Sequence, residues 1–271
     1  MQAIIKGIHV PKNLSELDLG LWKSIIKLYL NDPFTHIYLL YDIIYELDHI
    51  EVLFELAENN IIGYLFIWRG PRAVCIHIWG KAESLICNVP CDDKAIIVIH
   101  NRELLKHVVG FLKPKGEISV KEHLDMVADE RSFKPYSAGA AIRLDAGDSH
   151  HVEEFLRLTR IAGWKIDREK AKDLLMKRRY YGLFENGRLV SIACAFFRMP
   201  EIWPIGNVYT HPDYRGKGYA KAVTSAITRD ALQSGAKALL HVAEDNIPAI
   251  RVYEALGYKT ITKKPWIFFN P

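Results

Sequence analysis

The chain has few cysteines and no long apolar run. Its 271 residues include four cysteines, too few for a disulfide framework at this length. Cys87 and Cys91 stand four positions apart, but no second Cys or His pair at zinc-finger spacing accompanies them, so we expect reduced thiols and no metal. No apolar stretch reaches the roughly eighteen residues of a membrane span, and residues 1–12 lack the apolar core of a signal peptide. We therefore expect a cytoplasmic protein with no membrane partner.

The charge of the chain is only mildly basic, with a formal net charge of +4. A dedicated nucleic-acid-binding protein usually carries a strongly basic patch, so nucleic acid is not an expected partner. A small positive excess does suit the attraction of a small polyanion. With 49% hydrophobic and 25% charged residues, the composition is that of a globular protein, and the length allows one large or two small domains.

The segment Tyr209–Lys221 predicts a glycine-bearing turn between a strand and a helix. A strand-like run, 205–208, precedes it, and apolar residues at helical spacing continue through 222–234. Gly216 and Gly218 allow an open backbone in which successive N–H groups converge on an anion. The first turn of the helix adds unpaired N–H donors and the positive end of the helix dipole.

Positive side chains surround this turn, which predicts a phosphate or pyrophosphate ligand. They are Arg215, Lys217 and Lys221. A Walker loop is excluded because Gly218 is followed by Tyr219 rather than by Lys and Ser or Thr. A dinucleotide fingerprint needs three glycines and an acidic residue about twenty positions further on. It is excluded because only two glycines are present here and no matching acidic residue follows.

Two segments resemble the motifs of the GCN5-related N-acetyltransferases, the GNAT superfamily. Arg215, Gly218 and Ala220 follow the spacing R-x-x-G-x-A of that family's coenzyme A pyrophosphate loop, after a Thr210–Pro212 step. The segment Asn246–Tyr258 is similar to the family's other motif, and the order of the two segments fits. The resemblance covers most of the second half of the chain. It implies an α/β (α+β) fold, with a mixed, mostly antiparallel sheet flanked by helices, and acetyl-CoA as co-substrate.

The resemblance also implies which residues contact coenzyme A. The expected cofactor-binding residues are Val208, Tyr209, Thr210, Arg215, Gly216, Lys217, Gly218, Tyr219, Ala220, Lys221 and Asn246. Residues 208–210 would act through their backbone, with one N–H facing the thioester carbonyl, although the same residues also suit a plain core strand.

Tyr253 is the expected general acid. It stands seven residues after Asn246, close to two helical turns, so both face the same way. In the family such a tyrosine protonates the departing sulfur, and a phenol with a pKa of about 10 is protonated at neutral pH. Core packing is the alternative role for Tyr253.

The general base is expected at His241, near the end of a strand over 237–242. Relatives that acetylate protein N-termini have a glutamate at a similar position, and an imidazole with a pKa of about 6.5 also suits a base. A structural role for His241, Glu201 as base, and solvent acting through a water chain remain alternatives.

The two halves of the sequence share a layout of two helices followed by a hairpin. The hairpin turns are Glu58–Asn60 and Glu185–Gly187, and aligning them places Asn88–Asp93 opposite Arg215–Ala220. Since 88–93 contains no glycine and no basic residue, the first half is predicted to be a degenerate GNAT-like copy without a cofactor loop; an unrelated α/β domain is the alternative. The low periodicity of 126–137 suggests domains 1–137 and 138–271. The tandem layout resembles the glycine N-acyltransferase-like branch of the family.

These features predict an acyl-CoA-dependent N-acyltransferase that transfers acetyl to a primary amine by direct attack in a ternary complex, with its catalytic domain in 138–271. The acceptor would be a small-molecule amine or a protein or peptide amine. Two alternatives stay open. The chain could bind coenzyme A as a sensor or interaction protein without turnover, or it could be a protein N-terminal or lysine acetyltransferase.

Overall fold

The computed structural model describes residues 5–9, 18–58, 60–70, 73–136 and 141–271. The chain forms two compact units: unit 1 contains Met1–His123 and Lys263–Pro271, and unit 2 contains Leu124–Thr262. It passes from unit 1 to unit 2 within strand β6 (Glu117–Ala128) and returns within strand β12 (Lys259–Asn270). The expected domain boundary at 137/138 lies beyond β6, in a segment (137–140) outside the described residues. The division into an auxiliary and a catalytic domain stays a prediction.

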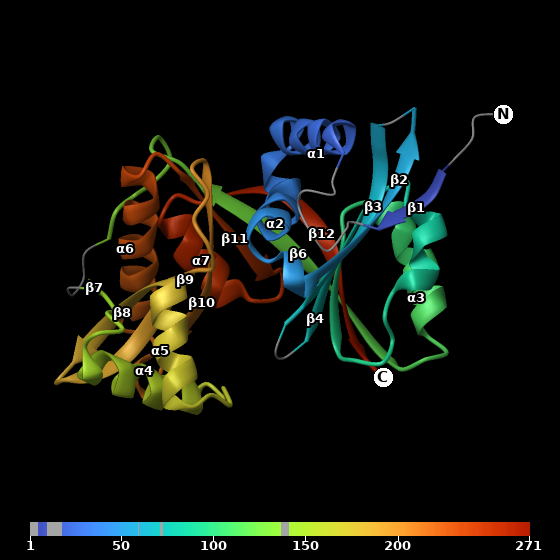
Figure 1. Ribbon diagram of the computed structural model, residues 1–271. Coiled ribbons are helices and arrows are strands. Elements are labelled where there is room, and N and C mark those ends of the chain that lie inside the picture. Colours follow the sequence, from blue (N-terminus) through green and yellow to red (C-terminus); the bar gives the residue numbers. More distant parts are fainter. Residues whose placement is uncertain (1–4, 10–17, 59, 71–72, 137–140) are drawn as a thin grey trace. The chain divides into compact units, whose positions relative to one another are not determined.

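Unit 1 is a mixed sheet with helices packed on it (Figure 1). Its strands follow the order β1-β2-β3-β4-β5, with the last part of β12 beside β5. All of the pairings are antiparallel except that of β4 with β5. The elements are β1 (Ile5–His9), α1 (Leu19–Asn31), α2 (Pro33–Tyr45), β2 (Ile50–Ala57), β3 (Asn60–Arg69), β4 (Val74–Gly80), the short 3-10 helix η3 (Glu83–Asn88), β5 (Ala95–Ile99) and α3 (Leu105–Leu112).

Aspartates cap the first two helices of unit 1. Asp18 Oδ1 accepts a hydrogen bond from the Leu21 N–H (2.9 Å), and Asp32 Oδ1 accepts one from the Thr35 N–H (3.2 Å). Helix α1 therefore begins at Leu19, directly after its N-cap Asp18.

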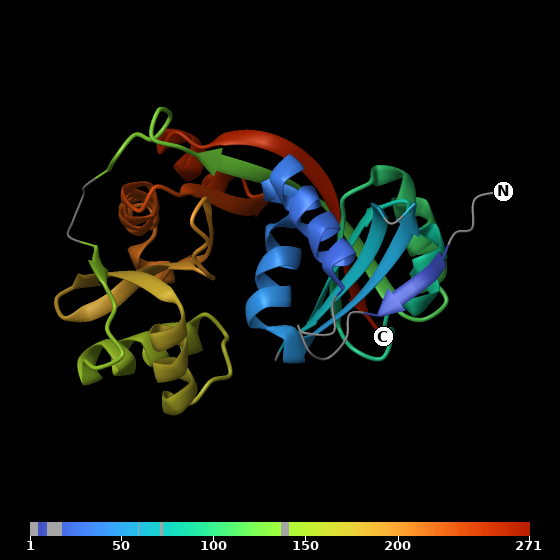
Figure 2. The ribbon, with the colours of Figure 1, turned by 45° about the horizontal axis from the view of Figure 1, so that its top comes forward.

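Unit 2 has a sheet covered by helices on both faces (Figures 1 and 2). Its strand order is β6-β11-β10-β9-β8-β7; β10 and β11 run parallel, and β7 to β10 are antiparallel neighbours. The elements are β7 (Ile142–Arg143), α4 (Ser149–Ile161), α5 (Arg168–Lys177), β8 (Arg179–Glu185), β9 (Arg188–Ala195), β10 (Ile202–Thr210), α6 (Tyr219–Gln233), β11 (Lys237–Ala243) and α7 (Ile247–Ala255). Helices α6 and α7 share one core with the sheet, and α4 and α5 share the other.

The order of elements in unit 1 is repeated in unit 2. Each unit runs from a strand through two helices and a hairpin to two parallel strands, β4 with β5 and β10 with β11. The connection between the parallel strands differs. In unit 2 it contains the fifteen-residue helix α6, whereas in unit 1 it contains only the six-residue η3. This repetition supports the proposal that the first half is a degenerate copy of the second.

Strand β6 is the element that pattern reading missed. The low periodicity of 126–137 suggested a boundary, but the strand continues to Ala128. Among the described residues, no helix combines the length and the apolar composition needed to cross a lipid bilayer.

Candidate functional site: a split between two parallel strands

Strands β10 and β11 separate at their carboxyl ends. They pair from Ile202–Lys237 to Ile205–Leu240, but β10 continues to Thr210 and β11 to Ala243. Both strands are fully described, and no ladder joins them beyond Leu240. In unit 1, by contrast, β4 and β5 pair as far as Ile78–Ile99. A split at the carboxyl ends of parallel strands is a common place for ligands in α/β proteins.

A β-bulge in β10 accompanies the split. The register of β10 against β9 shifts between Gly206 and Tyr209, and Asn207 has a left-handed backbone with φ of 50°. Bulges bend a strand and increase its local twist. A Cβ at Gly206 would lie 2.6 Å from the ring of Phe196, so a larger residue here would displace that ring. Of the expected contact residues, Val208 lies in the bulge, and Tyr209 and Thr210 directly follow it. No motif pointed to Asn207.

The loop between β10 and α6 has the open conformation expected from its glycines. Gly216 and Gly218 have φ of 77° and 82°, and Gly218 is the N-cap of α6. Because no side chain caps this helix, the N–H groups of its first turn stay available to a ligand. The loop therefore combines an anion-accepting backbone with the positive end of a fifteen-residue helix.

The basic side chains of the loop contact other parts of unit 2. Arg215 Nε donates to the Thr210 carbonyl (3.3 Å), and Lys217 Nζ lies 3.7 Å from a carboxylate oxygen of Glu185. The Tyr219 hydroxyl donates to the same carboxylate, and this hydrogen bond raises the pKa of Tyr219. Glu185, in the β8–β9 hairpin, thus fixes two loop residues. Ala220 follows Tyr219 in the first turn of α6.

Tyr136 is a further residue at the loop. A Cβ at Gly218 would lie 2.5 Å from the Tyr136 hydroxyl oxygen, so the phenol is in contact with the N-cap of α6. Lys221 Nζ lies over the Tyr136 ring, 4.2 Å from its centroid, and the Tyr136 N–H donates to Ser225 Oγ (2.8 Å). No motif pointed to this tyrosine, because it precedes α6 by more than eighty residues.

Asn246 and Tyr253 lie on α7 as expected. Asn246 is the N-cap, and its Oδ1 accepts a hydrogen bond from the Ala249 N–H (3.3 Å), so the side chain has a structural role of its own. Tyr253 is 7% exposed within the core that α6 and α7 share with the sheet. Burial raises its pKa to about 12, which keeps the phenol protonated.

His241 is the first residue of β11 after the last pair with β10, so it lies where the two strands part. Its Nδ1 is 2.6 Å from Oδ1 of Asp125 on β6. The side chains are 16% and 1% exposed, respectively. No motif pointed to Asp125, which precedes His241 by 116 positions. Glu201 lies at the opposite end of β10, where its carbonyl accepts the Lys237 N–H (2.8 Å).

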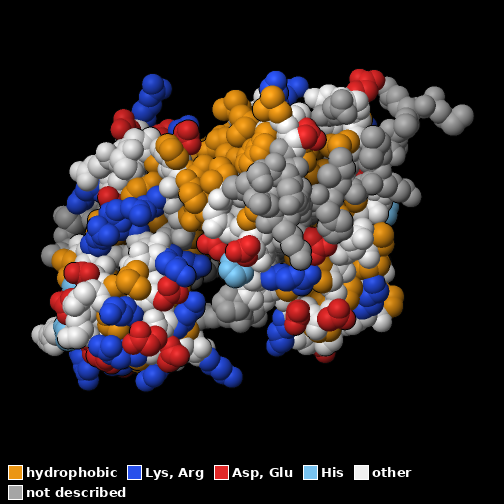
Figure 3. All heavy atoms as spheres, viewed as in Figure 1, with side chains coloured by type: hydrophobic (Ala, Val, Ile, Leu, Met, Phe, Trp, Pro, Cys, Tyr) orange, Lys and Arg blue, Asp and Glu red, His pale blue; other side chains and the backbone are white. Residues whose placement is uncertain are grey.

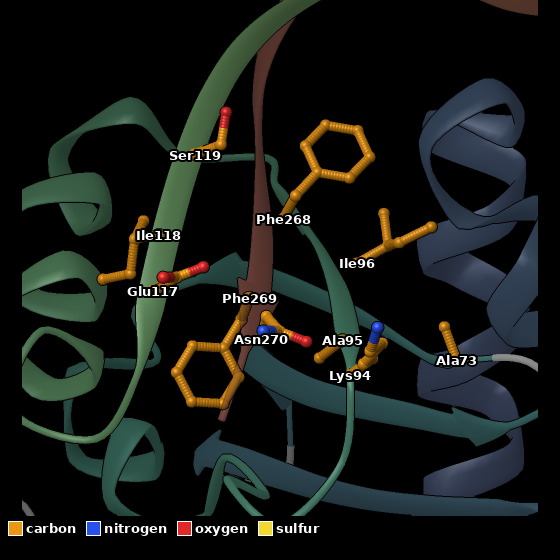
Figure 4. Close-up of a pocket in the computed structure, with 10 residues that line it drawn as sticks. All are labelled: Ala73, Lys94, Ala95, Ile96, Glu117, Ile118, Ser119, Phe268, Phe269 and Asn270. Carbon is orange, nitrogen blue, oxygen red and sulfur yellow. The ribbon is translucent and has the colours of Figure 1, made fainter.

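Two other features bear on ligands. The described residues contain no cluster of three or more His, Cys, Asp or Glu side chains that could hold a metal. A cavity of about 500 Å³ lies in unit 1, where Phe268, Ile96 and Ile118 project from β12, β5 and β6 (Figure 4). None of the expected site residues lines this cavity. On the face of unit 2 seen in Figure 3, basic and acidic side chains are interspersed.

Comparisons with known proteins find similar sequences and similar structures. Residues 180–267 match a family model described as FR47-like protein. A mycothiol acetyltransferase of Saccharomonospora viridis is 44% identical over 62 residues, which are 21% of this chain and 20% of that protein. An acetyltransferase of Yersinia pestis is 43% identical over 59 residues, which are 20% of this chain and 42% of that protein. The chain thus spans less than half the length of these curated relatives.

Solved structures share the fold over almost the whole chain. A tandem GNAT protein from the clavulanic acid biosynthesis pathway covers 98% of each chain with a TM-score of 0.63 and 13% identity. An acetyltransferase of the GNAT family from Colwellia psychrerythraea covers 98% of this chain and 100% of its own, with a TM-score of 0.59 and 11% identity. At such identities the similarity shows the fold. The chain therefore has a GNAT fold, and its residues 180–267 resemble the FR47-like family. The glycine N-acyltransferase-like branch stays a prediction.

Proposed function

We propose that this protein is an N-acetyltransferase that transfers acetyl from acetyl-CoA to a primary amine by direct attack in a ternary complex. The observation that carries the proposal is the split between β10 and β11, with a glycine loop and an uncapped helix N-terminus following β10. The pantetheine arm would lie along 206–210, and the pyrophosphate on the loop 215–221. The FR47-like match includes both segments.

The bulge would supply a hydrogen-bond donor to the thioester carbonyl oxygen. A backbone N–H turned out of the β9 ladder near Asn207 can donate to the thioester carbonyl oxygen, where negative charge develops during attack. One such donor contributes roughly 3 kcal/mol to the stabilisation of the transition state. This role uses the backbone, which explains why the side chains of 208–210 carry no recognisable signal.

Two protons leave the amine during one turnover, and His241 and Tyr253 would accept one each. His241 takes one proton from the ammonium form of the acceptor, and the neutral amine attacks the carbonyl carbon. The C–N bond forms, the C–S bond breaks, and Tyr253 donates its proton to the departing sulfur. The second proton lost by the nitrogen returns to Tyr253, and His241 releases its proton to solvent. General acids and bases of this kind each contribute roughly a hundred- to ten-thousand-fold.

The test of this proposal uses the full chain, acetyl-CoA and a panel of primary amines: polyamines, amino acids, and peptides with free N-termini or lysines. Free thiol should appear in equal amount with an acetylated amine. Coenzyme A binding without thiol release from any amine would favour the sensor alternative. Acetylation confined to the peptides would favour a protein acetyltransferase. A chain that does not bind coenzyme A would contradict the site itself.

A further inference from the structure

We propose that Asp125 is a positioning residue for His241: its carboxylate holds the imidazole with the proton on Nδ1, so that Nε2 can accept a proton from the amine. This inference rests on the proposed function and adds to it a residue from outside the predicted catalytic domain. The two side chains are joined at 2.6 Å, a short distance for a hydrogen bond between a ring nitrogen and a carboxylate.

The position of the pair in the sheet supports this role. Strand β11 lies between β6 and β10, so His241 has Asp125 on one side and the split on the other. The alternating residues Ala238, Leu240 and Val242 belong to the core beneath α6 and α7, which places His241 on the opposite face of the sheet. The imidazole is therefore attached to the protein through Nδ1 at the point where the strands part.

Asp125 is a charged group that contacts His241 directly. On β10, the residues level with the split are Ile205, Gly206 and Asn207, none of which carries a charge. The face of β11 that packs on α6 and α7 is apolar. Glu244 and Asp245 follow β11 in the sequence and are exposed. Asp125 is 1% exposed, so its effect on the imidazole is screened little by solvent.

The chemistry of the pair determines which nitrogen acts. A carboxylate accepts hydrogen bonds and donates none, so it selects the tautomer with Nδ1–H and leaves the lone pair on Nε2. When Nε2 takes a proton from the amine, the same carboxylate stabilises the imidazolium. An amide in place of the carboxylate can instead donate to Nδ1 and select the opposite tautomer. Asp125→Asn keeps the shape of the side chain and removes this selection.

The matched control is Asp230→Asn. Asp230 on α6 accepts from Arg179 Nη1 at 2.5 Å, and the two side chains are 22% and 15% exposed. Removing its charge also breaks a partly buried ion pair of unit 2, and the partner, Arg179, lies on β8, which is separated from β11 by β9 and β10. If the loss of a buried charge acts only by lowering stability, Asp125→Asn and Asp230→Asn should show the same dependence of kcat/KM on pH.

The decisive measurement is kcat/KM against pH for the wild type and both variants of the full chain, with acetyl-CoA and the best amine of the panel. We expect Asp125→Asn to lower kcat/KM about ten- to a hundredfold near neutral pH, while the coenzyme A Kd is unchanged. The deficit should shrink as the pH rises above the pKa of the amine, because a neutral amine needs no base. Asp230→Asn should keep the wild-type profile.

Other kinetic outcomes would contradict the positioning role of Asp125 or the proposed function. A deficit that is equal at all pH values, or shared by Asp230→Asn, would show that Asp125 is only structural. An active wild type whose Asp125→Asn variant is fully active would refute the positioning role alone, whereas a wild type without turnover would refute the proposed function as well. Should Asp125→Asn not fold, the ¹⁵N shifts of His241 in the wild type decide: Nε2 protonated and Nδ1 bare would overturn the inference.

Discussion

Replacing Gly218 by alanine tests the cofactor loop, and the chain offers a matched control at the other end of the same helix. Gly218 precedes α6 with φ of 82°, and Gly235 follows it with φ of 85°. A left-handed backbone costs an alanine roughly 1–2 kcal/mol, so both variants should lose a similar free energy of unfolding. The surroundings differ. A Cβ at Gly235 meets nothing within 4 Å, whereas a Cβ at Gly218 lies 2.5 Å from the Tyr136 hydroxyl oxygen.

The clash at Gly218 forces either Tyr136 or the loop to move. A shift of the loop misaligns at least one backbone N–H from the pyrophosphate, and a hydrogen bond to a charged group contributes about 1.5–3 kcal/mol. Coenzyme A affinity of Gly218→Ala should therefore fall roughly ten- to a hundredfold. Isothermal titration calorimetry measures this directly, and Gly235→Ala should bind as the wild type does. Because Tyr136 can also yield, Gly218→Glu, which adds a negative charge beside the pyrophosphate, decides: an unchanged Kd for this variant, or an equal loss in Gly235→Ala, would refute the assignment of the loop.

Three further predictions concern the acid, the first half of the chain and the pH dependence of stability. Tyr253→Phe should lower kcat about a hundredfold or more and leave acetyl-CoA affinity nearly intact, since the phenol acts on the leaving group; undiminished kcat would rule out this acid. Titration with coenzyme A should give one site per chain, because β4 and β5 do not part as β10 and β11 do; a stoichiometry of two would contradict the degenerate-copy proposal. Burial lowers the pKa of His36 to about 4 from its ordinary 6.5, against the influence of Asp32, which raises it. Between these pH values the unfolded chain binds a proton that the folded chain does not, so the free energy of unfolding should fall as the pH drops, by up to about 3 kcal/mol in this window. His36→Asn should remove that part of the slope in urea titrations, and equal slopes would show that His36 does not cause it.

The elements and the loop could be predicted from local sequence. Asp148 and Asp167 cap α4 and α5, Pro33 begins α2, and Gly216 and Gly218 have the left-handed φ of the open turn expected from the sequence. These features depend on residues within a few positions of one another, and helix caps and turns are local by nature.

The split and its neighbours could not be predicted in the same way. The end of the β10–β11 ladder depends on the register between strands and on a bulge at Asn207, which a single sequence does not encode in a readable pattern. Asp125 and Tyr136 reach the site from segments far from the motifs, because β6 enters unit 2 beside β11. Local sequence therefore indicated the loop and α7 but not the residues that the fold brings to them.

The most direct test of the central claim is amide hydrogen exchange of the full chain with and without coenzyme A. If the split seats the pantetheine arm and the loop seats the pyrophosphate, the ligand should slow exchange in 206–210 and 215–221 and leave β4 and η3 unchanged. Slower exchange between β4 and β5, or no change along β10 at saturating coenzyme A, would contradict the account.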